Sequence, residues 1–337
     1  MTRPSVAVLS APSHDLAGFA EARELAAFEH VDDPAVLGPV LDRVDAVLAW
    51  GRGRRELLER VPHTSRLRWI QSSSAGVEDL ASPVLRERGV VLTNAAGVFD
   101  AAMAESVLGF LLAFSGRLLE DARAEPGAWP QEPIRRLAGT VALVVGAGSI
   151  GTETGRLLRS AGLRVRGIAR TPRPPDRVFE SIAGAEALHE ELAVADHVVN
   201  VLPITPATRG FLDAAAFAAM RPGAIFVNIG RGATVDERAL TRALVDGRIG
   251  GAALDVFERE PLPAESPLWR MSNVLVSPHR AGDHEGWEDD VVAVFVDNLR
   301  RFVAGEPLRN VVDVELGYAP ADRSSADEAR TASAFRR

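Results

Sequence analysis

One short segment carries most of the information about architecture: Val144-Val145-Gly146-Ala147-Gly148-Ser149-Ile150-Gly151. It places a G-x-G-x-x-G pattern between an apolar strand pattern at residues 140–145 and a helical pattern at residues 152–160. In such a turn the first glycine allows a tight bend, the second lets a pyrophosphate approach the backbone, and the third lets the helix pack on the strand. The helix N-terminus also offers free N–H groups to an anion. The segment therefore predicts a dinucleotide-binding βα unit.

Strand and helix patterns continue to alternate beyond this turn. Together with residues 140–145, the later strands complete the six-stranded, doubly wound parallel sheet of a Rossmann domain. A helix at residues 101–124 is predicted to lead into this domain, and a helix at residues 286–303 to lead out of it. The later strands are predicted at residues 163–168, 197–202, 224–229, 251–256 and 273–277.

The first hundred residues show the same alternation without a glycine fingerprint of their own, which is typical of a flavodoxin-like α/β unit. The sequence thus predicts an α/β protein with two doubly wound parallel-sheet domains. A Rossmann domain, residues 101–285, is inserted in a flavodoxin-like domain formed by residues 1–100 and 286–318, and residues 319–337 are expected to form a flexible tail. Strands of the first domain are predicted at residues 5–9, 46–50, 67–71 and 90–93, with helical stretches such as 16–28 between them.

Composition removes several kinds of chemistry. The 337 residues include no cysteine, and all 38 basic residues are arginine. Thiol nucleophiles, thiolate metal sites, Schiff bases and the lysine of Walker A loops are therefore excluded. The net charge of −8 argues against a protein that mainly binds nucleic acid. Because no segment has the pattern of a signal peptide or of a membrane span, we expect a cytoplasmic protein that acts on small molecules, without a membrane partner.

The end of the next strand bears on which dinucleotide binds. For NAD, a carboxylate about 20 residues beyond the glycine turn pairs with the ribose hydroxyls. Here the chain reads Ile168-Ala169-Arg170-Thr171-Pro172-Arg173 instead. An arginine fork favours the 2′-phosphate of NADP, which a carboxylate would repel. We predict a preference for NADPH with NADH as the alternative, Arg170 and Thr171 on the phosphate, and Arg173 as a third candidate.

Three polar side chains, Arg231, Glu260 and His279, each follow a predicted strand of the Rossmann sheet. The carboxyl ends of parallel strands share one edge, where ligands bind, so we expect the three to converge beside a nicotinamide. Arg231 can hold a carboxylate and polarise a carbonyl. His279 can donate a proton near neutral pH, and Glu260 on its other ring nitrogen would favour the imidazolium. These roles together suit hydride transfer to a 2-keto acid.

Neighbouring residues offer alternatives to this assignment. Glu258 competes with Glu260 for the acidic role, and Glu260 is favoured because it lies past the strand end and before a proline. Asp255 is expected to contact either the cofactor or a neighbouring backbone. A metal site on His279 and His284 would lack a further ligand at a helical spacing, so no metal is predicted.

These motifs resemble the D-isomer-specific 2-hydroxyacid dehydrogenase family, which includes glyoxylate and hydroxypyruvate reductases. The resemblance implies an Arg–Glu–His catalytic set at Arg231, Glu260 and His279, a flavodoxin-like domain that binds substrate, and a homodimer. It also implies that the backbone amides of Ser74-Ala75-Gly76-Val77 receive the substrate carboxylate, with Trp50 lining the pocket. The matching pieces are residues 145–151, 228–232, 253–257, 260–263 and 277–279.

The predicted reaction is the reduction of a small 2-keto acid, of the glyoxylate or hydroxypyruvate type, to the D-2-hydroxy acid. NADPH gives the hydride and His279 the proton. Two alternatives stay open: a phosphite- or formate-type dehydrogenase of the same fold, and a non-catalytic regulatory protein that senses a dinucleotide. The predicted cofactor-binding residues are Gly146, Gly148, Ser149, Ile150, Gly151, Arg170, Thr171, Leu202, Pro203, Thr208, Ile229, Gly230, Asp255 and His279.

Overall fold

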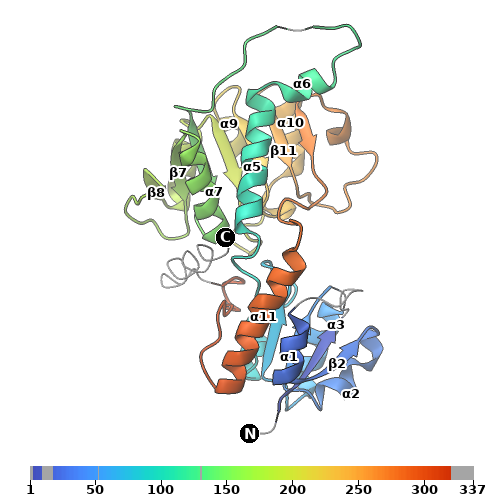
Figure 1. Cartoon of the computed structure of the whole chain (residues 1–337). Coiled ribbons are helices and arrows are strands. Elements are labelled where there is room, and N and C mark those ends of the chain that lie inside the picture. The colour runs from blue at the N-terminus through green and yellow to red at the C-terminus, as the bar shows by residue number, and fades with distance from the viewer. Residues whose placement is uncertain (1–2, 10–17, 52, 130, 320–337) are drawn as a thin grey trace. The chain divides into compact units, whose positions relative to one another are not determined.

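The structure is a computed structural model that describes residues 3–9, 18–51, 53–129 and 131–319 (Figure 1). The chain divides into two compact units. Unit 1 comprises Met1–Val98 with Glu285–Arg337, and unit 2 comprises Phe99–His284. The domain boundaries predicted near residues 100 and 285 lie next to these divisions. The predicted tail, apart from Ala319, lies outside the described residues.

Unit 1 is built on a parallel sheet of five strands in the order β2-β1-β3-β4-β5. This is the flavodoxin order 2-1-3-4-5, which agrees with the predicted flavodoxin-like unit, although only four of the five strands were predicted. The strands are β1 (Ser5–Leu9), β2 (Ala27–Val31), β3 (Ala46–Ala49), β4 (Trp69–Ser72) and β5 (Val91–Thr93). The helices are α1 (Phe19–Leu25), α2 (Leu37–Leu41), α3 (Arg54–Arg60), α4 (Pro83–Glu87) and α11 (Trp287–Ala304), with short 3-10 turns at Pro34–Val36 and Val61–His63.

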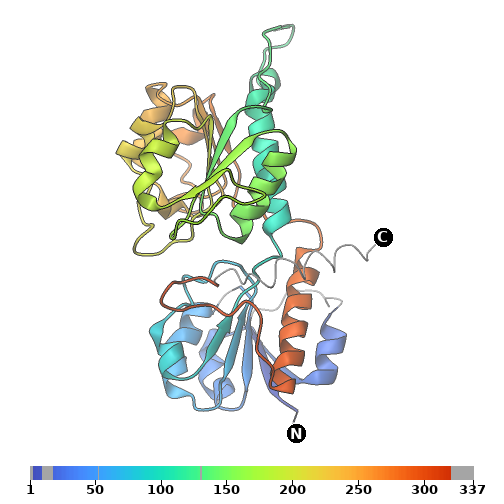
Figure 2. The same cartoon turned by 90° about the vertical axis from the view of Figure 1, so that its left-hand side faces the viewer.

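Helix α11 joins unit 1 although it follows unit 2 in the chain, and it lies beside α1 along the five-stranded sheet (Figures 1 and 2). Its fully buried Phe295 has its ring centroid 6.5 Å from Phe19 of α1, 6.1 Å from Phe28 of β2 and 5.6 Å from Trp69 of β4. Aromatic rings bury large apolar areas, so this cluster holds the returning helix against the sheet.

Strand β2 corrects the prediction of a helix over residues 16–28. Within the described residues, the helix ends at Leu25 and a parallel edge strand begins at Ala27, paired with β1 from Ser5 to Leu9. Phe28 packs edge-on against Phe19, with ring centroids 6.0 Å apart. Contacts with distant strands outweighed the local helical preference of this alanine-rich stretch.

Unit 2 is built on a parallel sheet of seven strands in the order β12-β11-β10-β9-β6-β7-β8. Counted within the unit, this is the Rossmann order 3-2-1-4-5-6 with one added strand, which confirms the predicted fold class. The strands are β6 (Val141–Val145), β7 (Arg164–Ile168), β8 (Ser181–Ala183), β9 (His197–Asn200), β10 (Ile225–Asn228), β11 (Gly251–Leu254) and β12 (Val274–Val276). The order reverses between β6 and β9, and ligands bind at such a point.

The helices of unit 2 cover both faces of this sheet (Figure 2). They are α5 (Asp100–Ser115), α6 (Leu118–Ala122), α7 (Ser149–Ser160), α8 (Leu188–Leu192), α9 (Ala214–Ala219) and α10 (Glu237–Val245), with 3-10 turns at Ala185–Ala187, Gly232–Thr234 and Pro267–Arg270. No helix in the described ranges is long and apolar enough to cross a membrane.

Two predictions for unit 2 were wrong in detail. The helix predicted over residues 101–124 is interrupted, because α5 ends at Ser115 with Gly116 as its C-cap, and Arg117 takes a left-handed conformation with φ 57° before α6. A Cβ at Gly116 would lie 2.9 Å from the carbonyl oxygen of Leu112, so a larger residue would not fit at this position without a shift of the backbone. The seventh strand, β8, was not predicted because three residues give too little periodicity.

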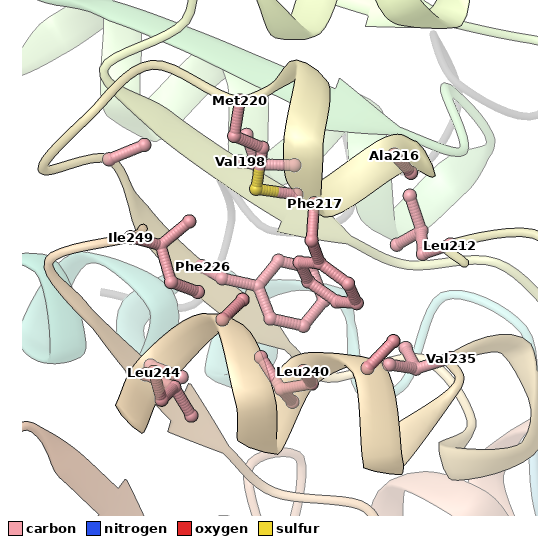
Figure 3. Close-up of a cluster of buried hydrophobic side chains, with 14 of the residues drawn as sticks. Val198, Leu212, Ala216, Phe217, Met220, Phe226, Val235, Leu240, Leu244 and Ile249 are labelled. Carbon is pink, nitrogen blue, oxygen red and sulfur yellow. The ribbon is translucent and has the colours of Figure 1, made fainter. Parts of the chain in front are cut away.

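One apolar cluster fixes the strand that leads to the predicted catalytic arginine (Figure 3). Phe217 of α9 and Phe226 of β10 are buried, with ring centroids 5.4 Å apart at 89°. Val198 and Leu240 belong to the same cluster. Because both faces of β10 are packed, the position where the strand ends is rigidly set.

Candidate active site

The glycine turn between β6 and α7 has the shape that a pyrophosphate requires. Gly146 has φ 109°, and a Cβ at Gly151 would lie only 2.0 Å from the carbonyl oxygen of Gly146. By contrast, a Cβ at Gly148 would meet nothing within 4 Å, so the backbone is open there. Within the described part of the chain, the N–H groups of Gly148, Ser149 and Ile150 donate to no protein acceptor. The turn therefore fits a dinucleotide phosphate.

The segment after β7 presents the residues predicted to select the cofactor. Arg170 and Thr171 follow the strand directly and are exposed. Arg173 donates from Nη2 to the carbonyl oxygen of Ala147, at 2.7 Å. This bond braces the glycine turn, so Arg173 has a structural role whatever else it contacts.

His279 and Glu260 form a hydrogen-bonded pair at the carboxyl edge of the unit 2 sheet. His279 Nδ1 lies 2.7 Å from Glu260 Oε2, and the Phe257 amide donates to Glu260 Oε1 at 3.0 Å. The imidazole is half exposed, with 51% of its side chain accessible. The carboxylate is thus held from both oxygens, and the other ring nitrogen, Nε2, bonds to no group in the part of the chain that the structure describes.

The pair favours its charged form. The hydrogen bond to Glu260 raises the pKa of His279 above its usual range, although burial opposes this. Burial alone would raise the pKa of Glu260, but the hydrogen bonds from His279 and Phe257 lower it below its ordinary value. Arg231 is close enough for its charge to lower both pKa values. An arginine, a carboxylate and an imidazolium are thus gathered at one edge.

A buried amide network that was not predicted from the sequence sets the backbone around Arg231. Asn200 at the end of β9 donates from Nδ2 to Asn228 Oδ1 at 2.9 Å and to Thr234 Oγ1 at 2.7 Å. Thr234 in turn donates to the carbonyl oxygen of Arg231 at 2.6 Å. All three partners are buried. Two asparagines that end neighbouring buried strands were the signal available in the sequence.

Asp255 contacts a neighbouring backbone, which is one of its two predicted roles. Its buried carboxylate accepts hydrogen bonds from the amides of Arg280 and Ala281, at 2.9 and 3.0 Å, and from Ser277 Oγ at 2.5 Å. His279 lies inside this loop with φ 51°, a left-handed conformation that costs about 1 kcal/mol. Asp255 therefore holds the imidazole in place.

The structure separates the two competing glutamates. Glu258 accepts a hydrogen bond from the amide of Glu237 at 3.1 Å, and the amide of Glu258 donates to Glu237 Oε2 at 3.0 Å. This reciprocal contact ties the loop after β11 to the start of α10. Of the two, Glu260 is the one that reaches His279.

The predicted cofactor loop after β9 is held by its own hydroxyls. Thr208 donates to the carbonyl oxygen of Pro203 at 2.6 Å. A Cβ at Gly230 would lie 2.7 Å from the carbonyl oxygen of Leu202, so the ends of β9 and β10 approach each other closely. Ile229 is buried beside them.

In unit 1, Trp50 is 7% exposed and stacks on Trp287, with ring centroids 5.8 Å apart and an angle of 25°. The two rings therefore stabilise each other within unit 1. The nearby segment Ser74–Val77 follows β4, and the N–H groups of Ala75, Gly76 and Val77 donate to no acceptor among the described residues. Three consecutive free amides suit an anion. No cluster of three His, Asp or Glu side chains in the described ranges could hold a metal.

Comparison with known proteins identifies the family of the chain. Residues 108–281 match the family model described as D-isomer specific 2-hydroxyacid dehydrogenase, NAD binding domain. The chain is 33% identical over 300 residues to glyoxylate/hydroxypyruvate reductase B of Pectobacterium carotovorum, covering 87% of this chain and 91% of the relative. It is 34% identical over 278 residues to (S)-sulfolactate dehydrogenase of Chromohalobacter salexigens, covering 80% of this chain and 88% of the relative.

A solved structure extends the likeness over both units. The NADPH-dependent glyoxylate/hydroxypyruvate reductase of Sinorhizobium meliloti, in complex with NADP and sulfate, matches with a TM-score of 0.81 and 30% identity. The match covers 94% of this chain and all of the other. The fold and site define an oxidoreductase that acts on CH–OH donors with a nicotinamide dinucleotide. The chain belongs to the D-isomer specific 2-hydroxyacid dehydrogenase family, as its motifs indicated.

Proposed function

We propose that this enzyme reduces a small 2-keto acid, of the glyoxylate or hydroxypyruvate type, to the D-2-hydroxy acid. The observation that carries the proposal is the His279–Glu260 pair, at 2.7 Å, beside Arg231. A histidine whose pKa is raised keeps its proton to higher pH than an ordinary histidine, and the protonated form is the one that reduction of a carbonyl consumes.

Each side chain of the site has a separate role in the proposed reaction. The glycine turn would hold the dinucleotide, whose nicotinamide would supply the hydride for the carbonyl carbon. Arg231 orients the keto acid through paired hydrogen bonds. As the carbonyl oxygen gains negative charge, His279 transfers its Nε2 proton to that oxygen, giving the hydroxyl. Glu260 keeps the ring orientation and stabilises the imidazolium through Nδ1.

The substrate carboxylate is proposed to bind the free N–H groups of Ala75, Gly76 and Val77. Backbone amides recognise an anion without adding a titratable group, so binding there is insensitive to pH around neutrality. Trp50 would offer the substrate an apolar contact rather than a hydrogen bond, because it is buried against Trp287.

We further propose that NADPH is preferred over NADH. Arg170 and Thr171 stand where NAD-binding relatives of this fold carry a carboxylate. A guanidinium there attracts the 2′-phosphate. The solved reductase from Sinorhizobium meliloti, which is NADPH-dependent and in complex with NADP, supports the same preference.

The test is a panel of glyoxylate, hydroxypyruvate, pyruvate, formate and phosphite, each assayed with both cofactors in the appropriate redox state. We expect NADPH oxidation with the small 2-keto acids, and a lower kcat/KM with NADH. Reduction of NADP by formate or phosphite would instead show that the enzyme is a formate- or phosphite-type dehydrogenase. Tight NADPH binding without turnover of any substrate would favour a dinucleotide sensor.

A homodimer is the proposed assembly. Apolar side chains are exposed along α5, α6 and the segment that follows: Leu112 (47%), Leu118 (55%), Trp129 (85%) and Ile134 (64%). Exposed apolar side chains grouped along one stretch of chain are typical of a protein contact. Light scattering of the purified chain would distinguish one copy from two. A cytoplasmic location stays a prediction.

A further inference from the structure

The carbonyl groups of the Ser74–Gly76 segment are all bound by unit 1 itself. The Ser74 carbonyl accepts from the Ala95 amide at 3.2 Å, and the Ala75 carbonyl from Asn94 Nδ2 at 2.7 Å. The Gly76 carbonyl accepts from Ser74 Oγ at 2.9 Å. Since these carbonyls are bound on the protein side, the amides that follow them are left without a protein acceptor. The anion-receptive shape thus depends on the groups that hold the carbonyls.

Arg54 is the side chain that gathers this segment. It begins α3, and only 13% of its side chain is exposed. Its Nη1 donates to Ser74 Oγ at 2.8 Å, and its Nη2 donates to Ser72 Oγ at 3.0 Å and to the Gly76 carbonyl at 3.4 Å. Its Nε lies 3.0 Å from Asp79 Oδ2. One guanidinium therefore contacts the chain at Ser72, where β4 ends, and also at Gly76 and Asp79.

The planar fork of an arginine suits this task in a way that other side chains do not. Five donors in fixed directions can bridge several acceptors at once, whereas an ammonium is a point charge on a flexible stem. Because Asp79 pairs with Arg54, the guanidinium acts through shape more than through charge.

We propose that Arg54 is a positioning residue for substrate binding, which fixes the Ser74–Gly76 carbonyls inward and so presents the amides of Ala75–Val77 to the substrate carboxylate. The inference rests on the proposed function of that segment. It predicts that loss of the fork weakens binding of the keto acid while leaving the cofactor turn and the His279–Glu260 pair untouched.

The experiment compares Arg54→Gln and Arg54→Lys with the matched control Arg55→Gln in the full chain. Arg55 is the next residue of α3, is 88% exposed, and pairs with Glu59 on the helix surface. Three quantities are measured: the Kd of NADPH, the Kd of the unreactive 2-keto acid analogue oxamate on the NADPH-bound enzyme, and kcat and KM for the best keto acid of the panel.

For Arg54→Gln we expect the oxamate Kd and the KM to rise about tenfold or more, because two or more hydrogen bonds from a charged donor are lost. We expect kcat to change by less than about threefold and the NADPH Kd to stay the same. Arg54→Lys should recover part of the loss, and Arg55→Gln should match the wild type. Values for Arg54→Gln within about twofold of Arg55→Gln, or a fall in kcat without a rise in KM, would overturn the proposal.

Two further outcomes are separable. If Arg54→Gln does not fold, as judged by circular dichroism and NADPH binding, Ser74→Ala takes its place. Removal of that hydroxyl should raise the oxamate Kd several-fold, and an unchanged Kd would overturn the role of the network.

If the wild type binds oxamate but turns over no keto acid, the proposed reaction fails while the Arg54 comparison still stands. If the wild type neither binds oxamate nor turns over a keto acid, both proposals are wrong.

Discussion

His279 and His197 lie at opposite edges of the seven-stranded sheet of unit 2, and their surroundings give them opposite properties. His279 follows β12 at the carboxyl edge, is half exposed, and pairs with Glu260, which raises its pKa. His197 begins β9 at the amino edge and is 8% exposed. Burial lowers the pKa of His197 to about 4. One residue type is thus suited to the proposed proton transfer at one edge and to packing at the other.

The difference follows from the common direction of the strands in a parallel sheet. At the carboxyl edge, loops after several strands bring polar side chains together around a ligand position. At the amino edge, polar groups satisfy the chain itself: Asp196 accepts from the Val141 amide at 2.9 Å and pairs with Arg221 at 2.6 Å. His197 Nε2 lies 3.2 Å from Thr140 Oγ1. Substitutions should therefore change kinetics at one edge and stability at the other.

The largest effect is expected from His279→Gln. Loss of the general acid should lower kcat of keto-acid reduction by about 10²- to 10⁴-fold, because proton transfer by a positioned side chain contributes that much. The NADPH Kd and the denaturation midpoint should stay near the wild-type values. Steady-state kinetics and chemical denaturation measure both, with the exposed His189→Gln as control. Near-normal turnover in His279→Gln would remove this histidine from the chemistry.

His197→Gln should show the opposite profile, with kcat preserved and a changed dependence of stability on pH. The unfolded chain binds a proton to His197 near pH 6.5, whereas the folded chain does so only near 4. Wild-type stability should therefore fall as the pH drops through this window, by about 3 kcal/mol from this one group. Unfolding in urea at several pH values would reveal a shallower fall in the variant. Parallel curves for the variant and the wild type would contradict the assignment.

Arg170→Ala probes whether the carboxyl edge also selects the cofactor. Removing the guanidinium should raise the KM for NADPH about tenfold or more while leaving the KM for NADH nearly unchanged, because one charge-assisted hydrogen bond to the 2′-phosphate is lost. The exposed Arg177→Ala serves as control. Equal rises in KM for both cofactors would assign Arg170 to general binding instead.

Glu260→Gln should have its clearest effect on the pH profile. Reduction needs the imidazolium, so kcat/KM should fall as the pH rises through the raised pKa of His279. Without the carboxylate that pKa drops, and the falling limb should move to lower pH. A pH series of initial rates measures the limb. If the limb keeps its wild-type position in Glu260→Gln, the coupling of the two groups is not what tunes the histidine.

The sequence was informative wherever a function needs a local pattern. The glycine turn, the missing carboxylate at Arg170 and the polar residues after three strands all depend on short segments whose position relative to a strand can be read directly. The amides of residues 75–77 were reached through family resemblance alone, since without it the segment reads as a turn.

Other features depend on contacts between residues far apart in the chain. Local spacing alone does not show that Glu258 binds the start of α10, that Asp255 anchors the His279 loop, or that Arg54 bridges Ser72 and Ser74. The residue types that the proposed chemistry requires could thus be identified from the sequence. The partner of each polar group was set by folding, because burial and hydrogen-bond geometry depend on every element that packs around it.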